Sequence, residues 1–217
     1  MIFHATALSS YSAKVRVALC VKQVPFVERP PPNGYRSPEY RAVVPMGTLP
    51  AIQVGDWVLS ESEVINEYLE ERYPLPALLP DDPQLRAQVR FVSRLHDLYL
   101  EPAVRALFAQ VRPQARDSAV VTRLRDAVLA RIDQLVGNVR PQPFLLTRTL
   151  SLADCGPLVT LPLAGMVLLA CGQPIALPAV LQHWLDTASR HPDVERALTP
   201  WRAATQAWLA TQTKESA

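Results

Sequence analysis

The hydrophobic pattern of this chain changes near residue 74, and the change divides the expected fold into two parts. Before it, short apolar runs rich in β-branched residues alternate with short helical patterns and prolines. After it, Leu, Val, Ala and Arg recur at helical spacing over long segments. The bridge at residues 74–82 is rich in proline and is typical of a stiff linker. We therefore expect domains at residues 1–73 and 83–217.

The first part is predicted to be an α/β domain built on a mixed four-stranded sheet. Alternating patterns and turn residues predict strands at residues 2–5, 25–28, 51–54 and 58–59. Helical periodicity predicts helices at residues 12–22, 37–43 and 61–72. The order β-α-β-α-β-β-α indicates helices packed against the sheet.

The second part is predicted to be all-helical. Apolar residues step by three or four through residues 85–99 and 121–135, and Pro102 is expected to bend or divide the first of these helices. Residues 155–182 carry no charge, and about 18 such residues can cross a bilayer. Four prolines and three glycines interrupt this stretch, which favours a buried core helix and no membrane contact.

Composition argues against several classes of function. Lys and Arg total 22 against 20 for Asp and Glu, an excess too small for the usual nucleic-acid-binding surface. The three cysteines form no CxxC pair, so neither a disulfide framework nor a metal site is expected. The first residues lack the pattern of a secretory signal, and we expect a cytoplasmic location. Dinucleotide, P-loop and GxSxG motifs are absent from the sequence.

Three short segments in the first part have the residue types of a binding site. Ser9, Ser10 and Ser12 follow the first strand and open a helix, where hydroxyls and free N–H groups favour an anion or a thiolate. By local pattern, Ser12 is the best N-cap of that helix. Leu49-Pro50 precedes the third strand, where a cis X-Pro bond would turn the backbone of Leu49 outward to pair with an extended peptide.

The third segment is the start of the helix at residues 61–72. Ser60 and Glu63 have the spacing of a capping box, which predicts Ser60 as the N-cap. Glu61 and Ser62 then lie in the first turn, where unpaired N–H groups and the helix dipole favour a bound carboxylate. The Ser62 hydroxyl would add a hydrogen bond, and Glu61 would hold an ammonium group.

Taken together, these segments resemble the soluble glutathione transferase family over nearly the whole chain. The matching segments are SSYSAKVRVAL, PFVE, GTLPAI and SESEVINEYLEERYP, together with the Ser151 to Asp154 segment of the helical part. The resemblance implies a thioredoxin-like N-terminal domain, an all-α C-terminal domain and a homodimer. It also implies a glutathione S-transferase that acts on a small hydrophobic electrophile.

The resemblance assigns roles to residues of this chain. Ser9 matches the serine whose hydroxyl faces the glutathione sulfur, although Ser10 and Ser12 are close enough in sequence to remain alternatives. Glutathione itself would be held by residues that match Thr48, Leu49, Pro50, Glu61 and Ser62. The second substrate would meet residues in and beyond the serine segment, which are Ser10, Tyr11, Tyr99 and Phe108.

Two other functions stay open at this point. The SSYS segment is similar to the SSCS segment of the zeta-class isomerases, which use glutathione for cis–trans isomerisation of maleyl-type acids; Tyr11 replaces their cysteine. A non-catalytic interaction module with the same fold is the other alternative.

In the transferase, a hydrogen bond from Ser9 would contribute roughly 1.5–3 kcal/mol to thiolate stability, which would lower the thiol pKa by about one to two units.

Overall fold

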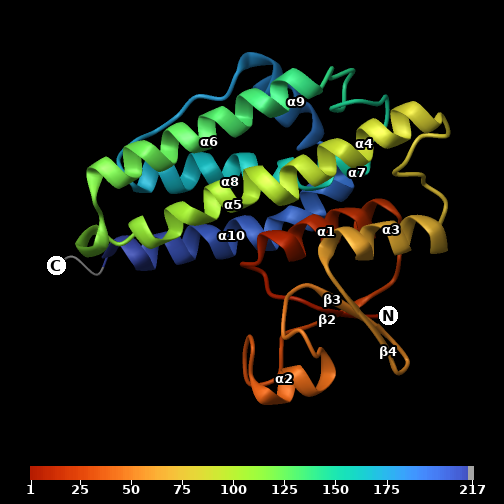
Figure 1. Ribbon diagram of the computed structural model, residues 1–217. Helices are drawn as coiled ribbons and strands as arrows, with labels where there is room; N and C mark the ends of the chain where they lie inside the picture. The colour runs from red at the N-terminus through yellow and green to blue at the C-terminus, as the bar shows by residue number, and fades with distance from the viewer. Residues whose placement is uncertain (215–217) are drawn as a thin grey trace.

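The computed structural model describes residues 1–214. Its first part holds four strands and three helices, and Figure 1 shows the sheet and α2 on one side of α1 and α3, with the remaining helices on the other. The bounds are β1 Ile2–His4, α1 Ser10–Val21, β2 Val27–Arg29, α2 Pro38–Val43, β3 Ala51–Val54, β4 Trp57–Ser60 and α3 Ser62–Arg72. The mixed four-stranded sheet and the helical remainder confirm the predicted fold class.

The sheet has the order β2-β1-β3-β4. β1 pairs in parallel with β2, so the chain must cross over through α1, while β3 pairs antiparallel with both β1 and β4. The last two strands form a hairpin whose turn contains Gly55 at φ 61°, a left-handed conformation that glycine adopts without steric cost.

The second part is mainly helical, with irregular connections at residues 139–151 and 171–178. Its α-helices are α4 Pro83–Leu95, α5 Glu101–Ala106, α6 Ser118–Asn138, α7 Leu152–Cys155, α8 Pro157–Ala170, α9 Ala179–Ala188 and α10 Pro192–Lys214. A π-helical turn, η1 His96–Leu100, joins α4 to α5, and short 3₁₀ turns follow at η2 Leu107–Gln110 and η3 Pro113–Ala115. The helix predicted to be divided near Pro102 is therefore interrupted at this π turn.

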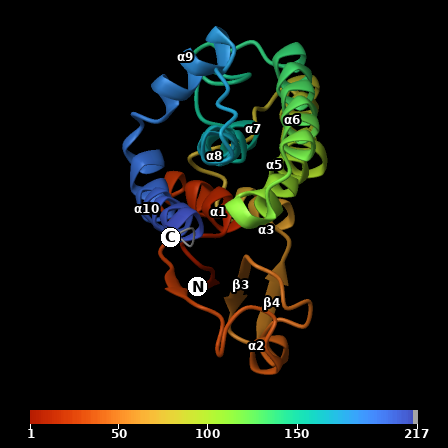
Figure 2. The same ribbon diagram turned by 90° about the vertical axis from the view of Figure 1, so that its left-hand side faces the viewer.

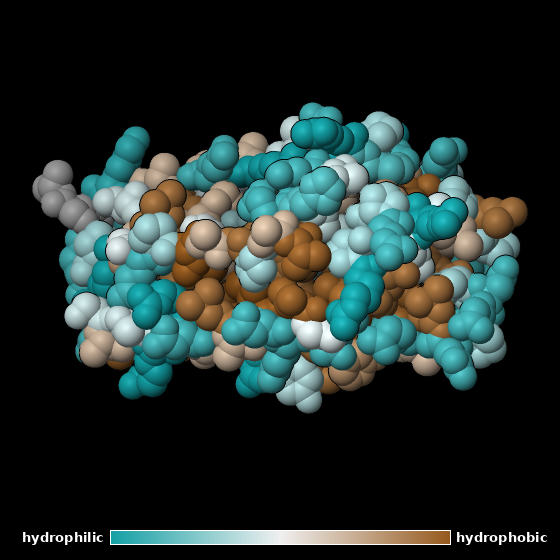
Figure 3. All heavy atoms as spheres, turned by 90° about the horizontal axis from the view of Figure 1, so that it is seen from above, coloured by the Kyte–Doolittle hydropathy of each residue, from teal (hydrophilic) through white to brown (hydrophobic). Residues whose placement is uncertain are grey.

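The uncharged segment lies in the middle of the helical part. Figure 2 shows α8 at its centre, with α10 on one side and α5 and α6 on the other. Leu152–Ala170 is long and apolar enough to cross a membrane, but 78% of that window is buried inside the protein. Figure 3 shows apolar side chains between hydrophilic ones on the face seen from above, and Leu169 of α8 is exposed. This apolar segment is therefore packed as a core helix of the helical part.

Polar contacts near the end of α1 connect this helix to the segment after α3 and to α10. Lys22 donates to the carbonyl oxygens of Tyr73 and Pro76 and pairs with Glu70, so it holds the connection after α3. Arg196 of α10 donates to the carbonyl of Cys20. The N-terminus of α7 has the expected capping box, in which Asp154 accepts from Ser151 and also from Trp184. The contacts of Lys22 and Arg196 therefore hold the end of α1 against α3 and α10.

Candidate functional site

A cavity of about 840 Å³ lies between the sheet end of the first part and the helices of the second. Its walls come from the loop after β1, the start of α1, the segment before β3, the start of α3 and the helices α4, α5, α8 and α10 with the turns between them. The lining residues are Thr6, Leu8, Ser9, Ser10, Tyr11, Tyr35, Thr48, Leu49, Glu61, Ser62, Glu63, Val64, Arg94, Asp97, Leu98, Arg105, Phe108, Leu163, Thr205 and Trp208. Most of the sequence-predicted site residues therefore face one space.

Ser9 is the N-cap of α1 and lines the cavity. Its φ of −72° and ψ of 117° are extended, and its Oγ accepts a hydrogen bond from the backbone N–H of Ser12 at 3.2 Å. A serine hydroxyl has one hydrogen to donate and two lone pairs to accept with. The cap uses a lone pair, so the hydrogen of Ser9 remains able to donate to an anion beside the positive end of the helix.

The two neighbouring serines are differently placed. Ser10 Oγ donates to Glu101 and accepts from Arg105 Nη2 at 2.7 Å, so its hydrogen is already used. Ser12 is fully buried and is absent from the cavity lining. The prediction of Ser12 as the N-cap is wrong. Ser9 is the N-cap, and Ser12 only donates its backbone N–H to the Ser9 hydroxyl. Of the three hydroxyls, that of Ser9 meets the requirements for a donor to a ligand.

The segment before β3 presents an unpaired backbone to the cavity. The Leu49–Pro50 peptide bond is cis, as predicted. Neither the N–H nor the C=O of Leu49 has a hydrogen-bond partner among residues 1–214. Thr48 lies beside it; its carbonyl accepts from Tyr40, and its buried hydroxyl is unpaired within the same residues. Pro50 is buried and sets the position of Leu49 without lining the cavity. Such a backbone can pair with an extended peptide.

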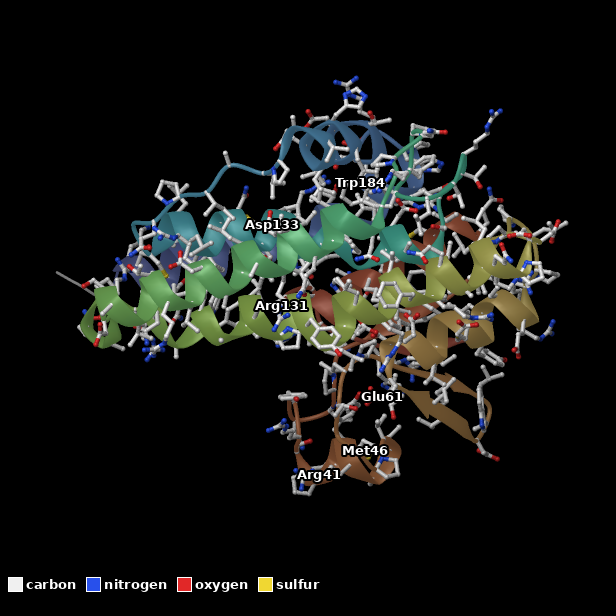
Figure 4. All side chains as sticks on the ribbon, turned by 45° about the horizontal axis from the view of Figure 1, so that its top comes forward. Arg41, Met46, Glu61, Arg131, Asp133 and Trp184 are labelled. Carbon is white, nitrogen blue, oxygen red and sulfur yellow. The ribbon has the colours of Figure 1, made fainter. Side chains whose placement is uncertain are left out.

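The N-cap of α3 is Glu61 and not Ser60 as predicted, but Glu61 and Ser62 still lie at the start of the helix and line the cavity. Glu61, with φ 75°, occupies the N-cap position without a side-chain bond, and Ser62 is the first helical residue. The predicted capping box of Ser60 is absent because Glu63 turns inward to Lys14. A positive φ is rare for a glutamate, and such strain is found mostly at functional sites. Figure 4 shows Glu61 in the space between the segment with Arg41 and Met46 and the helices.

Lys14 is the buried cation at the base of this site. Its Nζ lies 2.6 Å from Glu63 Oε2 and 2.8 Å from both carboxylate oxygens of Asp97, and its side chain has no exposed surface. Burial lowers its pKa, but the two carboxylates outweigh burial and raise it. Burial likewise raises the pKa of Asp97, while the hydrogen bond from His96 and the charge of Lys14 bring it down to about 2. We infer that Lys14 and Asp97 are both ionised near neutral pH.

Tyr11 lines the cavity beside the serine segment. Burial and the nearby charges of Glu101 and Asp97 raise its pKa to about 12, so the phenol stays protonated at physiological pH. Its hydroxyl donates to the carbonyl of Asp97, and the guanidinium carbon of Arg105 lies 4.9 Å from the ring centroid. The position of Tyr11 suits a wall residue with a neutral donor and excludes its use as a base near pH 7.

The far end of the cavity is apolar. Phe108 packs against Trp208 with their ring centroids 5.2 Å apart, and Leu163 completes the wall. Tyr99, which was predicted to line this end, lies elsewhere: it is half exposed, with the guanidinium carbon of Arg131 5.4 Å from its ring centroid. Asp97 and Leu98 of the same π-helical turn line the cavity instead.

Sequence reasoning missed four charged groups around the cavity, and one pattern could have revealed them. Arg94, Asp97, Glu101 and Arg105 recur every three or four residues along one helical stripe. Three of them line the cavity, and Glu101 is buried directly behind it. Among residues 1–214, no group of three or more His, Cys, Asp or Glu side chains is arranged to hold a metal ion.

Comparisons with known proteins agree on one family. The family described as "Glutathione S-transferase, N-terminal domain" matches residues 3–77. A glutathione S-transferase of Pseudomonas putida is 32% identical over 157 residues, which are 70% of this chain and 69% of that protein. A maleylacetoacetate isomerase of Pseudomonas aeruginosa is 36% identical over 141 residues, which are 60% of this chain and 66% of that protein, just under two thirds of its length.

A solved structure with a bound ligand shares the fold. It is a maleylacetoacetate isomerase from Methylobacterium extorquens AM1 with bound malonate and glutathione. Its TM-score is 0.75 at 22% identity, and the match covers 93% of this chain and 97% of that one. At this identity, the likeness establishes the architecture of both parts of the chain.

Proposed function

Because this chain belongs to the glutathione S-transferase family, we propose that it is an enzyme that binds glutathione at the polar end of the cavity and activates its thiol through Ser9. The observation that carries this proposal is the hydroxyl of Ser9, which caps α1 with a lone pair and keeps its hydrogen for a ligand. A free thiol has a pKa of about 8.5, so little thiolate is present at neutral pH without such help.

The polar end matches the chemistry of the tripeptide group by group. The unpaired backbone of Leu49 suits the extended cysteinyl unit, and Thr48, which lines the cavity, lies toward the glycyl end. The first turn of α3 suits the γ-glutamyl carboxylate, with Ser62 as a further donor. Glu61 would receive the ammonium group. Glutathione placed in this way brings its sulfur toward the start of α1.

The test of glutathione binding uses the charge of Glu61. Titration calorimetry of Glu61→Gln with glutathione is expected to give about a tenfold weaker Kd, since a hydrogen bond to a charged group contributes about 1.5 kcal/mol or more. Val54→Thr, an exposed change on β3 outside the cavity, is the matched control and should leave Kd unchanged. If wild-type protein gives no heat of binding, the interaction module remains and the enzyme proposal fails.

The second substrate is expected to be a small electrophile with an apolar body. Phe108, Leu163 and Trp208 form a wall that suits such a body, and Tyr11 with its neutral hydroxyl stands at the side of the sulfur. The thiolate would attack the electrophilic carbon and form a carbon–sulfur bond, while the bond to the leaving group breaks and, for an aryl halide, its electron pair departs with the halide ion. Ser9 keeps its proton throughout and donates a hydrogen bond to sulfur.

One observation favours a second candidate function, the isomerisation of a maleyl-type diketo acid. Arg94 and Arg105 both reach the cavity with exposed surface, and guanidinium groups bind carboxylates. The relative that shares the fold carries malonate, a dicarboxylate, with glutathione. In this reaction the thiolate would add to the double bond, rotation would follow, and elimination would return glutathione unchanged.

A comparison of two substrates separates the candidates. We expect glutathione consumption with an aryl halide, because a conjugate retains the sulfur. A maleyl-type diketo acid that changes its absorbance while total glutathione stays constant would instead identify the isomerase. The measurement is glutathione loss beside ultraviolet absorbance, with heat-inactivated protein as the control. Glutathione-binding protein that changes neither substrate would contradict both candidates.

We also propose a homodimer and a cytoplasmic location. Phe91 of α4 and Tyr99 of η1 are exposed and lie outside the cavity lining, and exposed apolar side chains are common at interaction surfaces. Sedimentation at the mass of one chain, 24.1 kDa, would contradict the dimer. The three cysteines are free and buried, which suits a reducing compartment.

A further inference from the structure

Tyr11 is the one residue of α1 that is not buried. Every other residue from Ser10 to Val21 is enclosed by the protein, whereas Tyr11 lies in the first turn, is partly exposed and lines the cavity. Activation of the thiol leaves its hydroxyl without a role, because Ser9 is the donor to the sulfur. A polar group on the wall of a largely apolar pocket is typical of a contact that orients a substrate.

The hydroxyl of Tyr11 is weakly engaged within the protein. It donates to the carbonyl oxygen of Asp97 across 3.4 Å, whereas an O–H···O hydrogen bond usually measures about 2.7–2.8 Å. Catalytic hydrogen bonds are often long before the substrate binds and shorten in its complex. The hydrogen of Tyr11 can therefore pass from this carbonyl to a stronger acceptor in the cavity at little cost.

The ring of Tyr11 is held in place by Arg105. The guanidinium carbon lies 4.9 Å from the centroid of the ring. The same guanidinium pairs with Glu101 at 3.0 Å and donates to Ser10 Oγ at 2.7 Å, which fixes its position. Because a guanidinium keeps its charge in proteins, Arg105 places a positive charge beside the phenol and favours a negative group in contact with it.

The acids near Tyr11 keep its hydroxyl neutral. Burial and the charges of Glu101 and Asp97 raise the pKa of Tyr11 to about 12, so the phenol keeps its hydrogen at physiological pH. The carboxylate of Asp97 is itself paired, with Lys14 at 2.8 Å and with Arg94 at 3.5 Å, which offsets the negative charge that it brings to the cavity. Tyr11 therefore offers a hydrogen-bond donor and not a base.

The hydroxyls of Ser9 and Tyr11 reach different parts of a bound electrophile. Ser9 Oγ stays at the cap of α1, whereas the longer side chain of Tyr11 extends to the carbonyl of Asp97 in η1. An electrophile that meets both has its attacked carbon beside the sulfur and its acceptor atom farther along the molecule. An α,β-unsaturated carbonyl compound has this separation, because the conjugated chain lies between the β-carbon and the carbonyl oxygen. In an epoxide the oxygen is bonded to the attacked carbon itself.

We propose that Tyr11 is a catalytic residue that donates a hydrogen bond to the carbonyl oxygen of an α,β-unsaturated ketone or aldehyde, the second substrate. The glutathione thiolate forms a bond to the β-carbon, the π electrons of the carbon–carbon double bond move toward the carbonyl, and its oxygen becomes an enolate anion. Tyr11 stabilises this anion and keeps its own proton. Water then protonates the α-carbon and the carbonyl forms again; the hydroxide left behind takes the proton that the thiol released.

This inference rests on the proposed glutathione chemistry and narrows its substrate class. The same enolate arises when a thiolate adds to the double bond of a maleyl-type diketo acid, so the Tyr11 hydroxyl serves either candidate reaction. An alkyl halide develops its negative charge on the departing halide and forms no oxyanion. The contribution of Tyr11 is therefore expected to depend on where the negative charge develops in the substrate.

Tyr11→Phe tests this role because it removes the hydroxyl and keeps the ring beside Arg105. With benzylideneacetone, a phenyl-substituted enone, kcat is expected to fall about 10- to 100-fold with little change in KM, since a hydrogen bond to a charged group is lost in the transition state. With benzyl chloride, kcat/KM is expected to stay within about threefold of wild type. Loss of glutathione thiol measures both rates after subtraction of the uncatalysed reaction. Tyr73→Phe, outside the cavity lining, is the matched control and should change neither rate.

Three outcomes would overturn the proposal. Equal losses with both substrates would show that the hydroxyl only maintains the shape of the cavity. An unchanged kcat for benzylideneacetone in Tyr11→Phe would remove the assigned contact. Wild-type protein that conjugates benzyl chloride and leaves benzylideneacetone untouched would refute the substrate class while the proposed function stands. Wild-type protein that binds no glutathione in calorimetry would defeat the proposed function, and this inference with it.

Discussion

Ser9→Ala is expected to lower kcat/KM for glutathione conjugation about 10- to 100-fold. The lost hydrogen bond to a charged sulfur contributes roughly 1.5–3 kcal/mol, and each 1.36 kcal/mol is a factor of ten. The variant also loses the N-cap of α1, which costs about 1 kcal/mol of folding stability. Rates should therefore be measured well below the unfolding temperature, together with the absorbance of the bound thiolate.

Ser12→Ala is the matched control for this prediction. The hydroxyl of Ser12 is buried with no partner among residues 1–214, and its backbone N–H still bonds to Ser9. Its kcat/KM should stay within about twofold of wild type, since the donor to sulfur is untouched. Equal losses in Ser9→Ala and Ser12→Ala would contradict the assignment of the donor and indicate damage to the start of α1.

The effect of Ser9→Ala on activity is also expected to depend on pH in a defined direction. A hydrogen bond to the thiolate lowers the thiol pKa, so wild-type protein should hold thiolate below the ordinary value of about 8.5. In Ser9→Ala the hydrogen bond to the thiolate is absent, so the thiol of bound glutathione ionises only at higher pH. The ratio of the two activities should thus be largest near neutral pH and should shrink as the pH rises past the thiol pKa of the variant.

The parts of the site that the sequence predicts are those that depend on local geometry. Ser9, Leu49 and Ser62 each lie where a short pattern sets the backbone: a strand-to-helix turn, an X-Pro bond and a helix start. The fold class follows for the same reason, because the strand and helix patterns of the first part are short and clearly separated. The predicted strands and helices lie within a few residues of those observed.

The errors have a common physical cause, which is competition from distant partners. Ser60 and Glu63 have the correct spacing for a capping box, but Lys14, 49 residues away from Glu63, takes the carboxylate. Local pattern carries no information on that competition. The resemblance assigned Tyr99 to the cavity, but the π turn brings Asp97 and Leu98 to the cavity and leaves Tyr99 half exposed. The buried ion pairs of Lys14 were missed because they too join residues far apart in the sequence.

Lys14→Met is expected to cost about 3–5 kcal/mol of folding stability. Removal of one partner from a buried ion pair leaves an uncompensated charge, and here two carboxylates, Glu63 and Asp97, lose the same cation. Urea unfolding at pH 7 measures the loss. Arg90→Met is the matched control, because the Arg90–Glu67 pair is partly exposed and contributes about 1 kcal/mol or less. A loss no larger than that of Arg90→Met would contradict the buried pair.

The stability difference between wild type and Lys14→Met should narrow in acid. The pKa of Asp97 is about 2 in the folded protein against an ordinary value of 3.8, so its stabilisation is complete above about pH 4 and is lost as the pH falls through 2. In Lys14→Met the pKa of Asp97 is expected to rise, because the charge and hydrogen bond of Lys14 no longer lower it, and its repulsion of Glu63 disappears once it is protonated. Urea unfolding at pH 7, 4 and 3 should show the difference shrinking toward the lowest pH. A constant difference would indicate that Lys14 stabilises the fold by packing and that its charge contributes nothing measurable.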